Sequence, residues 1–119
     1  MVTFGEAFPI ISVADVDRAV DFYCSTFGFE VTYTFDDAGT TAFAFLRLDP
    51  LGIGVAARKT VDDPDFALWI YADNVDEAAE RLRAAGAAEV LAPTDQPWGE
   101  RMCSFRDADG HLVHVGMRS

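Results

Sequence analysis

The sequence predicts an α+β domain in which two tandem βαβββ modules form one curved mixed sheet, with the helices outside and a concave cup inside. Three observations support this fold. The length of 119 residues, half of them apolar, fits a single domain over 1–119. Two helical segments about half a chain length apart resemble each other. Strand-like segments flank both helical segments in the same order.

The internal repeat has an offset of 59 residues. Residues 13–31 read VADVDRAVDFYCSTFGFEV, and residues 72–90 read ADNVDEAAERLRAAGAAEV, with a shared Val-Asp pair near the start and a shared Glu-Val pair at the end. The repeat predicts a first module at about 7–57 and a second module at about 66–117. A polar, proline-containing linker is expected between them at about 58–65.

Each repeat contains an amphipathic helix. The apolar positions with helical spacing are Val16, Ala19, Val20, Tyr23, Cys24 and Phe27 in the first, and Val75, Ala78, Ala79, Leu82 and Ala85 in the second. In the first helix Asp15 is the expected N-cap and Gly28 the expected stop. In the second, Asn74 followed by Glu77 resembles a capping box, and Gly86 is the expected stop.

The segments around the helices have the apolar patterns of strands. The expected strands are 8–13, 30–35, 41–48 and 52–57 in the first module, and 67–72, 88–91, 101–106 and 111–117 in the second. Turn sequences separate them: DDAG at 36–39, DPLG at 49–52 and DADG at 107–110. Each module therefore has the order βαβββ.

The composition excludes several classes of function. Twenty acidic and nine basic residues give a net charge of -11, which disfavours nucleic acid as a partner. No apolar run is long enough for a membrane span, and the N-terminus lacks the pattern of a signal peptide, so we expect a cytoplasmic protein. Cys24 and Cys103 lack metal-ligand spacing; two reduced core thiols are the favoured interpretation, and a disulfide between them is the alternative.

These patterns resemble the vicinal oxygen chelate superfamily. The resemblance rests on the duplicated βαβββ unit, the helix opening V-x-D-V-x-x-A-x-x-F-Y from residue 13 and the final D-x-D-G hairpin, and it covers roughly 7–117. The superfamily includes glyoxalase I, extradiol dioxygenases, fosfomycin-resistance enzymes and bleomycin-resistance proteins.

The resemblance implies where a metal ion would bind. The enzymes of the superfamily usually place a His in the first strand and a Glu in the last strand of each half. The matching positions here are Phe8, Gly54, Ala67 and His114. A catalytic divalent ion needs about three protein ligands and an open position, and only His114 can supply one. The resemblance therefore implies no metal and no cofactor, and it favours a binding protein over an enzyme.

Within the superfamily, the resemblance is strongest to bleomycin-resistance proteins. It is carried by AFPI at 7–10, by LWIY at 68–71, and by QPWG at 96–99 with Val113-His114 in the last strand. Those bacterial proteins are described as dimers that sequester the antibiotic in clefts between subunits, without chemistry. The resemblance implies a similar homodimer here. Its N-terminal strand is exchanged if Pro9 sets a crossover, and is not exchanged if Pro9 is an ordinary edge-strand proline.

Strand alternation predicts which residues line the cup. Phe8, Trp69, Tyr71 and His114 are expected to face inward, and Trp98 and Phe35 to join them from a loop and a strand end. This set suits a flat, partly aromatic ligand, and a positive charge on that ligand would add cation–π attraction. Trp69, Phe35 and His114 also have a purely structural interpretation as core residues. No acid–base pair is evident among the cup residues.

Three functions are consistent with the sequence. The first is metal-independent binding of a small molecule, in particular sequestration of a bleomycin-like antibiotic in a dimer cleft. The second is a glyoxalase-like lyase or isomerase, or a dioxygenase-type metalloenzyme, with non-standard ligands. The third is a regulatory or interaction module. The residues at the implied metal positions favour the first.

Overall fold

The computed structural model describes residues 1–118, and the chain divides into two compact units. The first unit is Phe8–Phe66, and the second unit combines Met1–Ala7 with residues 67–118. The elements in chain order are β1 (Phe4–Val13), α1 (Val16–Phe27), β2 (Glu30–Asp37), β3 (Thr40–Leu48), β4 (Leu51–Ala57), β5 (Phe66–Ala72), α2 (Val75–Ala84), β6 (Ala88–Asp95), β7 (Glu100–Arg106) and β8 (Leu112–Arg118). Neither of the two helices within residues 1–118 is long and apolar enough to cross a membrane.

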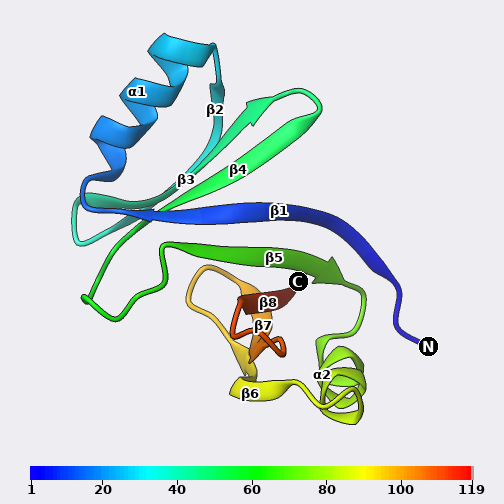
Figure 1. The fold of residues 1–119 in the computed structure, drawn as a ribbon. Coiled ribbons are helices and arrows are strands. Elements are labelled where there is room, and N and C mark those ends of the chain that lie inside the picture. The colour runs from blue at the N-terminus through cyan, green and yellow to red at the C-terminus, as the bar shows by residue number, and fades with distance from the viewer. Residues whose placement is uncertain (119) are drawn as a thin grey trace. The chain divides into compact units, whose positions relative to one another are not determined.

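The two units have the same strand arrangement (Figure 1). The strand order is β2-β3-β4-β1 in the first unit and β5-β8-β7-β6 in the second. In each, the first strand pairs in parallel with the last strand of its module, and the remaining pairs are antiparallel. The predicted α+β class with two βαβββ modules is therefore confirmed.

In the first unit, α1 covers one face of the sheet. The buried residues at this interface are Val16 of the helix and Ala44, Leu46, Ile53 and Val55 of β3 and β4. The strand residues are two positions apart, because successive side chains of a strand point to opposite faces. The residues between them, Phe45 on β3 and Gly54 on β4, therefore belong to the face away from α1.

The second unit repeats this arrangement with α2. Its buried core joins Val75, Ala78 and Ala79 of the helix to Ala72, Cys103, Phe105 and Val115 of the strands, together with Val2. The N-terminal segment packs here because Thr3 and Asp73 exchange two hydrogen bonds: the Thr3 amide donates to the Asp73 carboxylate at 2.9 Å, and the Asp73 amide donates to the Thr3 carbonyl at 3.1 Å. Burial raises the pKa of the Cys103 thiol to about 11, so it stays protonated.

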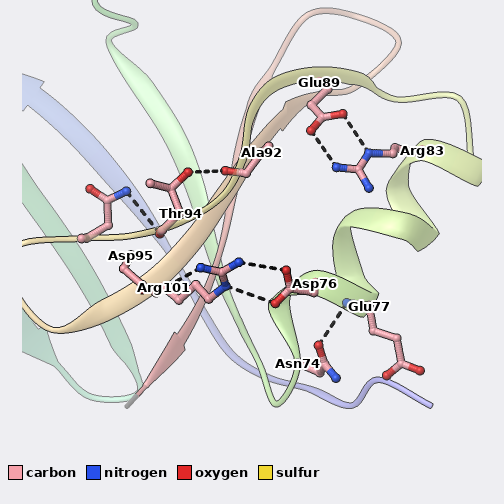
Figure 2. Close-up of polar contacts among 10 residues, drawn as sticks. Asn74, Asp76, Glu77, Arg83, Glu89, Ala92, Thr94, Asp95 and Arg101 are labelled. Atoms are coloured by element: carbon pink, nitrogen blue, oxygen red, sulfur yellow. Dashed lines mark hydrogen bonds and ion pairs between the residues drawn. The ribbon is translucent and has the colours of Figure 1, made fainter.

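The predicted N-caps, Asp15 and Asn74, and the predicted stop at Gly28 are confirmed, whereas α2 has its C-cap at Ala85, one residue before the predicted stop at Gly86. The Asp15 carboxylate accepts from the amide of Arg18 at 3.1 Å, and Gly28 ends α1 with a φ of 85°. In α2 the Asn74 side chain accepts from the amide of Glu77 at 3.1 Å (Figure 2). The Glu77 carboxylate lies 3.4 Å from the N-terminal ammonium group, so its charge is balanced by the chain terminus.

Ion pairs join α2 to the neighbouring strands β6 and β7 (Figure 2). The guanidinium of Arg101 contacts the Asp76 carboxylate at 3.0 Å and the Asp95 carboxylate at 3.1 Å. Arg83 and Glu89 form a two-bond pair, both bonds at 2.8 Å. Two-bond guanidinium–carboxylate pairs are geometrically specific, so they fix where the helix lies along the strands.

Several predicted strand boundaries were wrong, most of them by one or two residues. β2 continues to Asp37, into the predicted turn at 36–39. β1 begins at Phe4 rather than at residue 8, and β8 begins at Leu112 because His111 belongs to the preceding turn. β6 continues past Pro93 to Asp95 rather than ending at residue 91. Proline cannot donate to a strand ladder, but β6 is the last strand in the order and its pairing with β7 is irregular at this point, so the proline is tolerated.

The segment at 58–65 is a structured turn. The Asp63 carboxylate accepts from the amides of Lys59 at 2.6 Å and Thr60 at 3.1 Å, and these bonds hold its pKa below the usual range. Arg58 also pairs with the Asp65 carboxylate. The predicted linker thus has its own hydrogen-bond network.

The turn between β2 and β3 offers a test of local strain. Ala38 and Gly39 form it with φ values of 53° and 81°, and alanine is strained at a positive φ. We expect Ala38→Asn to raise the free energy of unfolding by about 0.5 kcal/mol, since asparagine tolerates this conformation. Denaturant unfolding of the variant and the native chain checks this. An unchanged or lower stability would contradict the assigned turn.

Candidate functional site

The candidate site lies on the sheet face of the second unit that points away from α2, here called the aromatic face. Pairing places Trp69 beside His114 and Tyr71 beside Gly116 across β5 and β8. On the next strand Ser104 lies opposite His114. Because side chains alternate between the faces of a sheet, these residues share one face and the core residues Cys103 and Val115 share the other.

Trp69 forms the floor of the aromatic face. Its side chain is only 6% exposed, and its ring centroid lies 5.7 Å from that of Tyr71 and 5.8 Å from that of His114. A Cβ added at Gly116 would lie 2.2 Å from the Trp69 ring. The indole therefore lies flat on the backbone of β8, in a space that only glycine leaves free.

Glu100 connects two aromatic side chains. The Tyr71 hydroxyl donates to one carboxylate oxygen of Glu100 at 2.6 Å, and the Trp98 indole N–H donates to the other at 2.7 Å. Trp98 is 38% exposed, whereas Tyr71 is partly buried. Burial and the hydrogen bond to Glu100 raise the pKa of Tyr71 well above its usual range, so the phenol keeps its proton at neutral pH.

Arg118 covers the ring of Tyr71. Its guanidinium carbon lies 3.7 Å from the ring centroid, which is a stacked cation–π contact. The same guanidinium donates to the Glu6 carboxylate at 3.0 Å. In β7 and β8 Arg118 lies opposite Glu100, so two carboxylates and one cation surround the phenol of Tyr71.

His114 is held by Ser104. The Ser104 hydroxyl and His114 Nδ1 are 2.7 Å apart, and Ser104 is only 3% exposed. Burial lowers the pKa of His114 to about 4. The imidazole is therefore neutral at pH 7 and too weak a base to activate the Ser104 hydroxyl. This pair suits hydrogen bonding rather than nucleophilic catalysis.

The first unit carries aromatic residues on the sheet face opposite α1. Phe8 is 8% exposed and packs edge-on against Phe45 at 4.7 Å between ring centroids. Phe35 lies opposite Phe43 across β2 and β3. The rings of Phe43 and Phe45 occupy the space beside Gly54 and Gly52, at 2.8 Å and 2.4 Å from a Cβ added there.

The residues at the implied metal positions do not fit a metal ion. Phe8, Gly54 and Ala67 offer no ligand atom, and the Phe43 ring fills the space that a side chain at Gly54 would need. The fourth position, His114, already shares Nδ1 with Ser104. Elsewhere in residues 1–118, three grouped donors come from Asp107, Asp109 and His111, which form the exposed turn before β8 and lie off the aromatic face.

Of the six residues predicted to bind ligand, the structure gathers four in the second unit: Trp69, Tyr71, Trp98 and His114. Phe8 and Phe35 belong to the first unit and are described there. The prediction missed Glu100, Arg118 and Ser104. Strand alternation applied to β7 and β8 would have placed them on this face, because each is an even number of residues from Met102 or His114. The structure also shows a hydrogen-bonded pair that the prediction did not contain, between the Tyr71 hydroxyl and the Glu100 carboxylate.

The position of Trp69 can be tested at Gly116. We expect Gly116→Ala to lower the free energy of unfolding by about 2 kcal/mol, because the new methyl group would displace the Trp69 ring. Gly5→Ala is the matched control, since a Cβ at Gly5, also in a strand, meets nothing within 4 Å. Denaturant unfolding of both variants checks this, and equal stabilities would contradict the packing.

The buried state of His114 can be tested by its titration. We expect the His114 ring signals in NMR to titrate with a midpoint of about 4. Since the pKa is lower in the folded chain than in the unfolded chain, stability attributable to His114 is complete above about pH 6.5 and falls as the pH drops toward 4. His114→Gln should remove this dependence, whereas His111→Gln, at the exposed second histidine, should retain it. A His114 midpoint near 6.5 would contradict the assigned burial.

Comparisons with known proteins agree with this fold. The model of the Glyoxalase/Bleomycin resistance protein/Dioxygenase superfamily matches residues 6–115. No curated protein matches the chain. Among solved structures, a member of that superfamily from Vibrio splendidus 12B01 is similar with a TM-score of 0.73 and 18% identity, covering 97% of this chain and 99% of the other.

Two further solved structures are similar at low identity. A Streptomyces coelicolor methylmalonyl-CoA epimerase variant in complex with 2-nitronate-propionyl-CoA has a TM-score of 0.78 and 19% identity, covering 98% of this chain and 96% of the other. A Legionella pneumophila protein described as an NAD-dependent benzaldehyde dehydrogenase has a TM-score of 0.76 and 16% identity, covering 96% of this chain and 100% of the other. These likenesses concern the fold, and the family match covers most of the chain. The chain therefore belongs to the Glyoxalase/Bleomycin resistance protein/Dioxygenase superfamily.

Proposed function

We propose that this chain binds a small, flat, partly aromatic molecule on the aromatic face, without a metal ion. The observation that carries the proposal is the placement of Trp98. Its indole is 38% exposed, yet its N–H is fixed by Glu100 beside Tyr71. An exposed ring held in one orientation is a prepared stacking surface, because ordering it costs no further entropy on binding.

The residues at the family's metal positions support binding without a metal. Three of the four offer no donor atom, and the fourth, His114, offers one ring nitrogen, Nε2, because Nδ1 is hydrogen-bonded to Ser104. Superfamily enzymes that use a divalent ion need several donors converging on one point. The aromatic face instead offers rings, one carboxylate and one neutral imidazole.

The protonation states also favour binding over acid–base catalysis. The pKa of Tyr71 is raised and the pKa of His114 is lowered to about 4, so neither group exchanges protons readily near neutral pH. Both act there as fixed hydrogen-bonding groups.

A more specific version of this proposal is that a homodimer of this chain sequesters a bleomycin-like antibiotic. It rests on the resemblance of the QPWG loop at 96–99, which contains Trp98. A bleomycin molecule combines flat aromatic rings with positive charge, and the chain's net charge of -11 would attract a cation.

A fluorescence titration tests the proposal. Trp69 and Trp98 are the two tryptophans of the chain, so ligand binding at the aromatic face should change the emission. With metal-free and copper-loaded bleomycin we expect saturable quenching at about one ligand per chain, unaffected by a chelator. Trp98→Ala should weaken binding about tenfold, because it removes an exposed stacking ring.

Phe22→Ala is the matched control, since Phe22 is an exposed aromatic residue on α1, 53% exposed. It should leave the affinity unchanged. A divalent ion in the purified protein, together with loss of binding or activity when a chelator is added, would contradict metal-independent binding. It would favour a lyase, isomerase or dioxygenase function. Absence of quenching by bleomycin together with binding of other aromatic compounds would contradict only the antibiotic assignment.

A further inference from the structure

The ring of Tyr71 already has an occupant. The guanidinium of Arg118 is stacked on it at 3.7 Å from the centroid, a separation typical of direct face contact. A guanidinium is flat, delocalised and weakly hydrated, and it therefore resembles a planar organic cation more than a metal ion or an ammonium group. The chain itself thus shows which chemistry this position accommodates.

Two carboxylates lie near the Tyr71 ring and that cation. Glu6 from β1 accepts a hydrogen bond from the guanidinium at 3.0 Å, and Glu100 lies opposite Arg118 in the pairing of β7 with β8. A carboxylate has about four acceptor sites, and the bonds from Tyr71 and Trp98 use two of those of Glu100. Glu100 can accept further donors from a group stacked on the phenol.

The contacts of Arg118 are exposed and weak. Its side chain is 62% exposed and that of Glu6 is 43% exposed. Exposed ion pairs and exposed cation–π contacts each contribute little, because water solvates the separated charges well. A ligand cation that also gains stacking area on Trp98 can therefore replace the guanidinium at small cost.

We propose that the ring of Tyr71, with Glu6 and Glu100 beside it, is a subsite for a planar organic cation, an amidinium or aromatic iminium group, and that Arg118 occupies this subsite when no ligand is bound. Arg118 is then a competitor of the ligand rather than a part of its binding surface. The inference deepens the proposed function and rests on it, because it concerns the cationic group of a ligand bound at the aromatic face.

Benzamidine and benzamide are suitable probes, because they are nearly the same in shape and differ in charge. NMR titration can follow the indole N–H signal of Trp98, which Trp98→Phe assigns. We expect Arg118→Ala to tighten benzamidine binding about fivefold and to leave benzamide binding unchanged. Glu100→Gln, which keeps an acceptor for Tyr71, should weaken benzamidine binding and spare benzamide.

Arg83→Ala is the matched control, because Arg83 is another half-exposed arginine paired with a glutamate, at the α2 side of the second unit. It removes the same charge and should change benzamidine affinity less than about twofold. Weaker benzamidine binding by Arg118→Ala would overturn the inference, since the guanidinium would then belong to the binding surface. Equal effects of both arginine substitutions would also overturn it, because they would reflect net charge alone.

The two proposals fail in distinguishable ways. If both probes bind the native chain with equal affinity and Arg118→Ala changes neither, aromatic binding stands and the cation subsite is wrong. If the folded native chain and the folded Arg118→Ala variant shift with neither probe, and the bleomycin titration is also flat, both proposals are wrong.

Discussion

The parallel pairing of the first and last strands of each module is the constraint on which the site depends. It brings β5 next to β8, two strands far apart in the chain, so that Trp69 lies beside His114 and Tyr71 beside Gly116. One helix per module can cover only one sheet face. On the other face of the second unit, the large side chain of Trp69 packs on the sheet itself. Glycine at 116 permits this, since the Trp69 ring takes the space that a side chain there would need.

The sheet face that the helix leaves uncovered is packed differently in the two units. In the first unit the rings of Phe43 and Phe45 lie over glycines, and Phe8 packs edge-on against Phe45, so this face is filled with hydrocarbon. In the second unit the corresponding face keeps polar groups in defined bonds. The position on β4 implied as a metal position is Gly54, which has no side chain, whereas the one on β8 is His114. The same strand arrangement thus carries an aromatic, apolar face in one unit and a face with hydrogen-bonded polar side chains in the other.

Local signals in the sequence were sufficient for the helices and most strands. The caps at Asp15 and Asn74 and the helical spacing of apolar residues depend on neighbours within four residues, and they were predicted correctly. The extension of β6 through Pro93 was not predicted, because the tolerance of proline depends on β6 being the last strand of its sheet. Glu100 and Arg118 were missed for a related reason. Their roles come from cross-strand contacts with Tyr71, and the register that creates these contacts is a property of the assembled sheet.

Glu100 joins the two aromatic side chains Tyr71 and Trp98 through hydrogen bonds. An ionised carboxylate beside aromatic rings is costly unless donors satisfy it, and Tyr71 and Trp98 supply two charge-assisted hydrogen bonds. These bonds fix both rings, and burial together with the bond to Glu100 raises the pKa of Tyr71, so the phenol stays protonated. Glu100 thereby sets the orientation of the two aromatic side chains relative to each other. The proposed binding of a flat ligand uses this order, because rings already held by hydrogen bonds lose little further entropy when a ligand stacks on them.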